Sequence, residues 1–326
     1  MKRKILATVC CLALIGAALT GCNNNTVPTA ASNTGAGSSA AGTAAGDTKI
    51  ALITMDQIDQ YWVKMNGGAQ AEAKTKGVKC DFLSPDTKDD SKQIECVNNA
   101  VSNGYKAIMV AANGPDAISS ALKDAQAAGI KIIYVDSPAN VKAEATFSTD
   151  NVSAGKQAGE EMLKALKAKN VTKGNIGIVN VNAATQSTVN REKGFRSAFT
   201  SSNFKLLDTQ YCDGDASKAQ SIAENYITQG VVGIFGANEG AATGTGNAIK
   251  AAKGSKVIGV GFDKSDTIKG LIKDGYLLCT MAQNPDIMGA KGVDACVDAI
   301  NGKDLGGAVT DTGVTILNKD NVASAK

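Results

Sequence analysis

The chain has 326 residues, enough for two domains of ordinary size, and 43% of them are apolar, which allows a core of normal size. Setting aside Lys2, Arg3 and Lys4 at the N-terminus leaves 31 of the 34 Lys and Arg residues, which balance 31 Asp and Glu residues. That balance argues against a nucleic-acid-binding surface. The absence of histidine excludes Ser-His-Asp and Cys-His catalysis and histidine metal sites.

The N-terminal segment has the parts of a secretory signal peptide. A basic start, 1–4, precedes an uncharged apolar run, 5–19, that is short for a membrane span. We therefore predict a signal peptide over 1–21. The following LTGC resembles the lipobox of bacterial lipoproteins, which implies that Cys22 is lipidated and anchors the mature chain to the membrane. The alternative is an ordinary signal peptide with an incidental cysteine.

Residues 23–48 consist almost entirely of Asn, Thr, Ala, Ser and Gly. Such a segment buries too little apolar area to offset the entropy lost on ordering. We expect 22–48 to comprise the lipidated cysteine and a flexible linker, with the folded part starting at Lys49.

From Lys49 onward, apolar strand-like runs alternate with helical patterns in two successive sets. The first runs are KIALIT (49–54), VKCDFL (78–83), KAIMVAA (106–112), KIIYVD (131–136) and ATFST (145–149). The second are NIGIVNV (175–181), FKLLDTQ (204–210), VVGIFG (231–236), KVIGVGF (256–262) and YLLCTM (276–281). This alternation predicts an α/β fold with two doubly wound parallel-sheet lobes.

We expect both lobes to be discontinuous, because a long helix at 286–301 and a last strand at 314–317 follow the second set. The N-terminal lobe is predicted to comprise 49–150 plus 284–309, and the C-terminal lobe 151–283 plus 310–326. Three crossings, near 150–151, 283–284 and 308–311, would form a hinge with a ligand cleft between the lobes.

The first strand leads into a loop that suits a ligand site, because open α/β sheets bind ligands at the carboxyl ends of their strands. Asp59 lies in this loop, and Tyr61 and Trp62, the single tryptophan of the chain, close it. We predict that these three residues contact a small polar ligand. The alternative for the two aromatic residues is packing in the core of the lobe.

Polar residues also follow later strands. They are Asp136, Asn238, Asp263 and Gln283, and Arg191 opens a helical stretch after 175–181. Carboxylates accept hydrogen bonds from hydroxyl groups, amides and Arg donate them, and aromatic faces cover C–H surfaces, so this mixture suits a neutral polyol. A helix-capping role is the alternative for any one of these residues.

Cysteine and glycine patterns do not indicate a cofactor or a metal site. Five cysteines remain after Cys22, no C-x-x-C is present, and most lie in apolar runs, as buried free cysteines do. The stretch GAATGTG (240–246) lacks the spacing of either nucleotide-binding glycine motif. We therefore expect neither a cofactor nor a bound metal ion.

These features together resemble the solute-binding proteins of ABC transporters, of the ribose- and galactose-binding type, whose fold is shared with lactose-repressor-type regulators. The marks are KIAL, IIYVDSP, STDN (148–151), REKGF (191–195), GANEGAATG (236–244), GVGFD (259–263) and MAQNPDIMGAKGV (281–293). The resemblance implies that Tyr61 and Trp62 sandwich a sugar ring. It also implies that Asp136, Arg191, Asn238, Asp263 and Gln283 bind its hydroxyl groups.

Four positions depart from the ribose-binding pattern. Ser137 replaces an arginine, Gly214 a phenylalanine, Met55 a small polar residue and Asp59 an asparagine. These departures keep the class of sugar-binding protein but argue against ribose itself, and they leave space near Gly214 and Ser137 for a larger or differently substituted sugar.

The expected function is that of an extracytoplasmic, lipid-anchored monomer that captures a sugar by clamshell closure and delivers it to ABC permease subunits. The main alternative is a receptor that presents a sugar-like signal to a membrane sensor. An enzyme is disfavoured because the chain has no histidine and no metal motif. A transcription regulator is disfavoured because the chain has an export signal and no basic helix-turn-helix.

Overall fold

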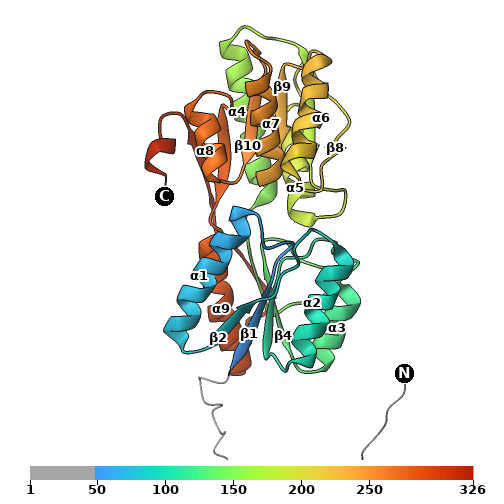
Figure 1. Cartoon of the computed structure of the whole chain (residues 1–326), viewed down its shortest axis with the longest axis vertical. Helices are drawn as coiled ribbons and strands as arrows, with labels where there is room; N and C mark the ends of the chain where they lie inside the picture. Colours follow the sequence, from blue (N-terminus) through green and yellow to red (C-terminus); the bar gives the residue numbers. More distant parts are fainter. Residues whose placement is uncertain (1–47, 326) are drawn as a thin grey trace, which may run out of the picture. The chain divides into compact units, whose positions relative to one another are not determined.

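The N-terminal lobe is built on a wholly parallel six-stranded sheet (Figure 1). The computed structural model describes residues 48–325. The strand order is β12-β5-β4-β3-β1-β2. The strands are β1 (Lys49–Ile53), β2 (Lys79–Phe82), β3 (Ala107–Val110), β4 (Lys131–Val135), β5 (Ala145–Ser148) and β12 (Ala308–Asp311). The helices are α1 (Gln60–Lys76), α2 (Asp90–Ser102), α3 (Ser119–Ala127) and α9 (Pro285–Ile300).

Both faces of this sheet are buried, as the apolar run of β1 requires. Ile50 and Leu52 pack in one core with residues of α1 and α9. Ala51 and Ile53 point to the other face and pack with residues of α2 and α3. Figure 1 shows the two helix pairs on opposite sides of the sheet.

The C-terminal lobe has a seven-stranded sheet in the order β13-β11-β10-β9-β6-β7, with β8 also paired to β6. The strands are β6 (Gly174–Asn180), β7 (Phe204–Leu206), β8 (Gln210–Tyr211), β9 (Gly233–Gly236), β10 (Ile258–Phe262), β11 (Cys279–Gln283) and β13 (Val314–Asn318). The helices are α4 (Asn151–Ala168), α5 (Gln186–Ala198), α6 (Ala216–Thr228), α7 (Glu239–Ala251), α8 (Asp266–Lys273) and the short η2 (Val322–Ser324). Strand β13 pairs antiparallel to β11, and the other pairings are parallel. The prediction of two doubly wound α/β lobes is confirmed.

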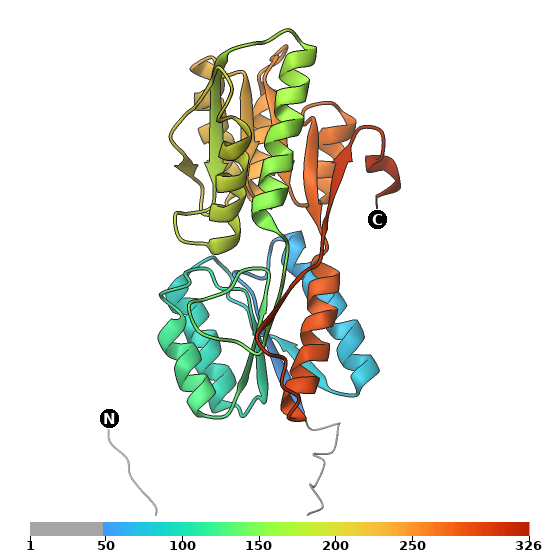
Figure 2. The same ribbon diagram turned by 180° about the vertical axis from the view of Figure 1, so that it is seen from behind.

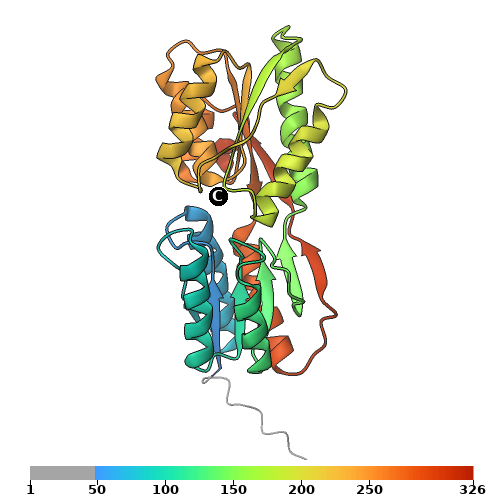
Figure 3. The ribbon, with the colours of Figure 1, turned by 90° about the vertical axis from the view of Figure 1, so that its right-hand side faces the viewer.

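The predicted end of the N-terminal lobe at residue 309 is wrong. Strand β12 pairs with β5 along its whole length, up to Asp311 opposite Ser148, so the chain leaves the first sheet after that pair. Figure 3 shows the late, red part of the chain forming the edge of this sheet. The other crossings lie between β5 and α4, after Asp150, and between β11 and α9. Figure 2 shows the C-terminal segment running from the first lobe into the second.

The crossings are hydrogen-bonded to one another. The amide nitrogen of Asp150 donates to Asp311 Oδ1 at 3.0 Å, and Asn284 Nδ2 donates to the carbonyl oxygens of Thr312 at 2.9 Å and Gly313 at 3.3 Å. A few polar contacts, rather than a large apolar interface, therefore tie the three segments together.

The signal peptide, Cys22 and the linker lie outside the described residues. Within 48–325, no helix is long and apolar enough to cross a membrane. The five cysteines of this part are free, and four of them are buried.

Candidate functional site

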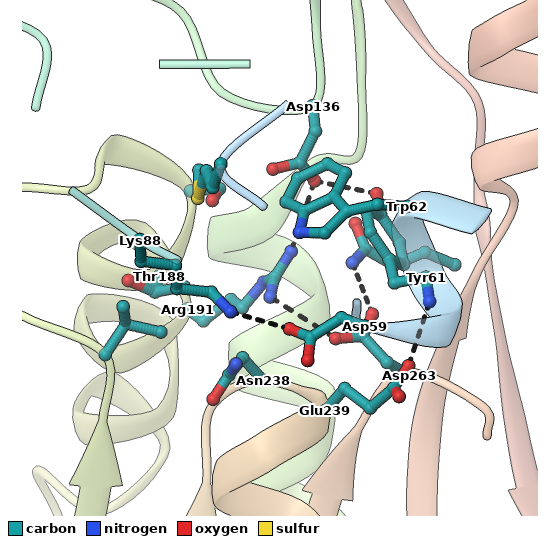
Figure 4. Close-up of a pocket in the computed structure, with 14 residues that line it drawn as sticks. Asp59, Tyr61, Trp62, Lys88, Asp136, Thr188, Arg191, Asn238, Glu239 and Asp263 are labelled. Carbon is teal, nitrogen blue, oxygen red and sulfur yellow. Dashed lines mark hydrogen bonds and ion pairs between the residues drawn. The ribbon is translucent and has the colours of Figure 1, made fainter. Parts of the chain in front are cut away.

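A polar cavity of about 30 Å³ lies between the two sheets, at the carboxyl ends of their parallel strands, and residues of both lobes line it (Figure 4). Its lining residues are Met55, Asp59, Tyr61, Trp62, Lys88, Asp136, Val181, Ser187, Thr188, Arg191, Asn238, Glu239, Asp263 and Gln283. All eight binding residues expected from the sequence are among them. Sugar-sized pockets are roughly ten times larger, so a ligand enters only if side chains or lobes move apart.

The two aromatic residues begin α1 and belong both to the cavity and to the core. Their rings meet edge to face, with centroids 4.7 Å apart. The Tyr61 hydroxyl donates to Asp136 Oδ1 at 2.7 Å, and Trp62 Nε1 donates to Asp56 Oδ2 at 3.1 Å. Core packing and cavity lining are therefore not exclusive, because these side chains pack on the lobe and orient two carboxylates as well.

Arg191 lies between the two aspartates that end equivalent strands. Its guanidinium is 3.6 Å from Asp136 and 4.0 Å from Asp263, and it stacks over the Phe262 ring at 4.0 Å. Its Nε donates to Asn151 at 2.8 Å and its NH1 group to the carbonyl oxygen of Ala237 at 3.0 Å. The side chain is almost fully buried and fixed from several directions.

Two glycines allow α4 and α5 to pack closely, which positions the buried Arg191. A Cβ on Gly155 of α4 would overlap the carbonyl oxygen of Arg191, and a Cβ on Gly194 of α5 would overlap that of Val152. The backbones of α4 and α5 can therefore approach closely, which brings the first turns of α5 against the cleft.

Asp136 and Asp263 share an unusual backbone. Asp136 follows β4 and Asp263 follows β10, and both adopt the left-handed conformation, with φ of 64° and 72°. This region is uncommon for residues other than glycine and often marks functional sites. The amide nitrogens donate to Phe147 at 2.8 Å and Met281 at 2.9 Å, which holds each turn against the neighbouring strand.

Burial raises the pKa of both aspartates. The pKa of Asp263 is raised to about 6. Burial is the main cause and repulsion by Asp136 and Asp59 adds to it, while Arg191 and a hydrogen bond from Gln283 lower the pKa. The pKa of Asp136 is also raised by burial, although Arg191 and the Tyr61 hydroxyl act to lower it. Gln283 Nε2 donates to Asp263 at 2.6 Å, and Gln283 in turn accepts from Thr149 of the other lobe at 2.8 Å.

Asn238 serves as a helix cap, the alternative role considered for it. Its Oδ1 accepts from the amide nitrogen of Ala241 at 3.0 Å at the start of α7, which leaves the Nδ2 group to donate to a ligand. Asp59 precedes α1 but makes no side-chain cap. Its Oδ2 instead accepts from Lys88 at 2.8 Å.

Lys88 is a site residue that sequence reasoning missed. Its Nζ lies 2.5 Å from Asp56 Oδ2 and 2.8 Å from Asp59 Oδ2. Burial lowers the pKa of Lys88, but the two carboxylates outweigh it and raise the pKa above the usual value. Its position in the sequence could have indicated this, because Lys88 lies in the loop after β2, at the same edge of the sheet as the other site residues.

Gly214 explains how Lys88 reaches the cleft. A Cβ on Gly214 would lie 2.7 Å from Lys88 Cε, so a larger residue would push the lysine out. The expectation that a ligand fills the space near Gly214 stays a prediction, because the flexible end of Lys88 lies there and Gly214 also lines a chamber of about 410 Å³ beside the cavity. The space at Ser137 is closed, since this fully buried serine accepts from the amide nitrogen of Ser187 at 3.3 Å.

Glu239 connects the two lobes directly. It is the first residue of α7, and its carboxylate accepts from the amide nitrogens of Gln60 at 3.2 Å and Tyr61 at 3.0 Å. It thus caps α1 of the other lobe. Burial, aided by the charges of Asp263 and Asp59, raises the pKa of Glu239 to about 8 against the opposing effect of the two donors.

The arrangement is suited to binding rather than to metal chemistry. No group of three or more His, Cys, Asp or Glu side chains could hold a metal ion within the described part of the chain. Carboxylates, amides, a guanidinium and two aromatic rings instead converge from opposite lobes. Together they define a two-lobed binding protein for a small polar ligand.

The chain belongs to the periplasmic binding protein family, because the model of the periplasmic binding protein domain matches residues 50–304. Among curated relatives, the ribose import binding protein of Escherichia coli strain K12 is 30% identical, over 78% of this chain and 85% of that protein. The D-allose-binding periplasmic protein of the same organism is also 30% identical, with the same coverage.

A solved structure of a carbohydrate transporter solute-binding protein from Agrobacterium radiobacter, in complex with D-arabinose, has a similar fold. It is 30% identical, with a TM-score of 0.81 over 85% of this chain and 96% of that one. The expected family and fold are confirmed. Membership of a family of binding proteins also confirms that the chain is not an enzyme.

Proposed function

We propose that this protein is the sugar-binding component of an ABC importer and acts outside the cytoplasmic membrane. The observation that carries the proposal is the convergence of Asp136 from one lobe and Arg191 and Asp263 from the other on one buried cavity. Relatives of similar length are named for ribose and allose, and the structural neighbour holds D-arabinose.

The eight residues Asp59, Tyr61, Trp62, Asp136, Arg191, Asn238, Asp263 and Gln283 would contact the sugar. The N-terminal lobe would be 48–149 plus 285–311, and the C-terminal lobe 151–283 plus 314–325. Closing around the sugar stabilises the closed arrangement only if the sugar contacts both lobes. The two-sided wall supplies contacts of that kind.

Binding would be tested by thermal-shift measurements on the purified protein with a panel of pentoses and hexoses, followed by calorimetry. Three or four hydrogen bonds to charged groups, at about 1.5–3 kcal/mol each, suffice for a micromolar complex. A sugar that raises the melting temperature and binds with roughly micromolar affinity supports the proposal. If no sugar of the panel binds, the proposal fails.

We further propose that Cys22 carries a lipid anchor and that the loaded protein docks as a monomer on permease subunits. Support for the anchor comes from the LTGC sequence after the apolar run. Replacing Cys22 by Ser should abolish fatty-acid labelling and release the protein or leave it uncleaved. A Cys22→Ser protein that is still processed and labelled would contradict the anchor.

Delivery to permease subunits has its own test. Deleting the importer genes should abolish uptake of the bound sugar if the protein serves import. Unchanged uptake combined with loss of a sugar response would favour the receptor that presents a signal.

A further inference from the structure

The wall of the cleft carries more negative than positive charge. Five carboxylates line the cavity or pair with a residue that does: Asp56, Asp59, Asp136, Glu239 and Asp263. Within the described residues, two cations, Lys88 and Arg191, line the same cavity. Because burial raises the pKa of Glu239 to about 8, this group is largely protonated at neutral pH until a cation lies beside it. Four charged carboxylates then face two cations, and because buried charges are costly unless they are paired, this surplus calls for a positive partner.

Neither cation neutralises more than part of this surplus. Lys88 is shared by Asp56 and Asp59 at 2.5 and 2.8 Å. Arg191 stands 3.6 and 4.0 Å from Asp136 and Asp263, beyond direct hydrogen bonding, and directs its Nε and NH1 donors to Asn151 and Ala237 instead.

Glu239 receives only backbone donors, from Gln60 and Tyr61. The nearest lysine along α1, Lys64, donates to the carbonyl oxygen of Lys264 at 2.8 Å and does not line the cavity.

The approach to the cavity is acidic as well. A neighbouring chamber of about 410 Å³ shares Asp59, Lys88 and Glu239 with the cavity and is also lined by Asp86, Asp213 and Asp215. Lys92 and Lys218 pair with Asp86 and Asp213 on the exposed rim. Clefts lined by one sign of charge raise the local concentration of the opposite sign, here a cation.

The residues that line the cavity indicate which kind of cation it would bind. The carboxylates are spread over both lobes and do not form a metal-binding group in the described chain. The aromatic rings of Tyr61 and Trp62 lie among them (Figure 4). Aromatic rings and carboxylates together suit an organic ammonium group, which is drawn to ring faces and forms charge-assisted hydrogen bonds with carboxylates.

We propose that the preferred ligand is a sugar carrying a protonated amino group, held by the carboxylates of Asp136, Glu239 and Asp263. This inference rests on the proposed sugar-binding function. The hydroxyl groups of the sugar would use Arg191, Asn238 and Gln283, and the ammonium group would supply the missing positive charge.

The experiment compares matched sugars on the full-length protein by thermal shift and calorimetry at neutral pH. The probes are D-glucosamine, D-galactosamine and D-mannosamine, each against its parent hexose and its neutral N-acetyl derivative. At least one amino sugar should bind about tenfold more tightly than both neutral counterparts, a difference of about 1.4 kcal/mol. A neutral sugar that binds equally or better overturns this inference but leaves sugar binding standing. If nothing binds, both proposals fail.

A charge variant with a matched control tests the assignment to these carboxylates. Asp263→Asn keeps the shape and removes one negative charge. It should lower the amino-to-neutral affinity ratio by about tenfold, while Asp274→Asn, on the exposed end of α8, should leave the ratio unchanged. Asp136→Asn provides a second, independent variant in the other lobe. Unchanged ratios in both cleft variants, with melting temperatures showing that they are folded, would overturn the assignment.

Discussion

Glu239 should make closure of the two lobes depend on pH. Its carboxylate accepts the amide protons of Gln60 and Tyr61 from the opposite lobe, and burial raises its pKa to about 8 from an ordinary 4.5. When the lobes separate, water reaches the carboxylate and the pKa returns towards the ordinary value. Closure then takes up a proton, so the contribution of Glu239 favours closure at low pH and is lost as the pH rises through about 8.

The magnitude follows from the two pKa values. Between about pH 7 and pH 9, a group that shifts from 4.5 to about 8 makes closure harder by about 1.4 kcal/mol, or about tenfold in the equilibrium constant. The pKa of Asp263 is raised only to about 6, so most of its effect falls at lower pH. Asp136 and Asp59 act in the same direction as Glu239, because burial raises their pKa values too. Lys64 acts in the opposite direction, because burial lowers its pKa.

Small-angle scattering of the ligand-free protein across this pH range would measure the closed fraction, with Trp62 fluorescence as a second readout. The closed fraction of the wild-type protein should fall between about pH 7 and pH 9. Glu239→Gln imitates the neutral acid, so this variant should remain as closed at the higher pH as at the lower. Equal pH dependence in variant and wild type would refute the reasoning.

Three further predictions concern individual side chains. Trp62→Ala should weaken sugar binding with little loss of folding, as seen by calorimetry and melting temperature; a variant that is mostly unfolded but binds normally when folded would favour a purely structural role. Gly155→Ala should destabilise the protein by about 1–3 kcal/mol in urea unfolding, because the added methyl overlaps the carbonyl oxygen of Arg191, and an unchanged stability would contradict the close packing of α4 and α5. Lys88→Met should lower the free energy of unfolding by about 3–5 kcal/mol, because it leaves two carboxylates without a cation. An unchanged free energy of unfolding in the same urea assay would show that these ion pairs contribute little.

The sequence was sufficient to predict the two sheets, because strands buried on both faces appear as uninterrupted apolar runs. It was also sufficient to predict that Asp136 and Asp263 lie at the cavity, because the carboxyl ends of parallel strands meet at one edge of a sheet. The run 204–210 was expected as one strand and instead forms β7 and β8. Residues 207–209 separate the two strands, and the carbonyl oxygen of Asp208 accepts from the Tyr226 hydroxyl at 2.7 Å.

The features that the sequence did not predict depend on contacts between distant segments. Lys88 reaches the cleft only because Gly214, more than a hundred positions later, has no side chain to block it. Glu239 was visible as a polar residue after a strand, but its partners are backbone groups of α1 in the other lobe. The end of β12 depends on pairing with β5, which no local pattern in 308–311 reveals.

The central claim is that one sugar is held between the two lobes. Calorimetry with the best-binding sugar of the panel, on the wild type and on Asp136→Asn and Asp263→Asn, tests it most directly, with the exposed Asp274→Asn as control. We predict roughly micromolar binding by the wild type and the control, and a loss of at least about tenfold for each cleft variant, since each removes a charged contact from a different lobe. Wild-type affinity in both folded cleft variants would contradict the account.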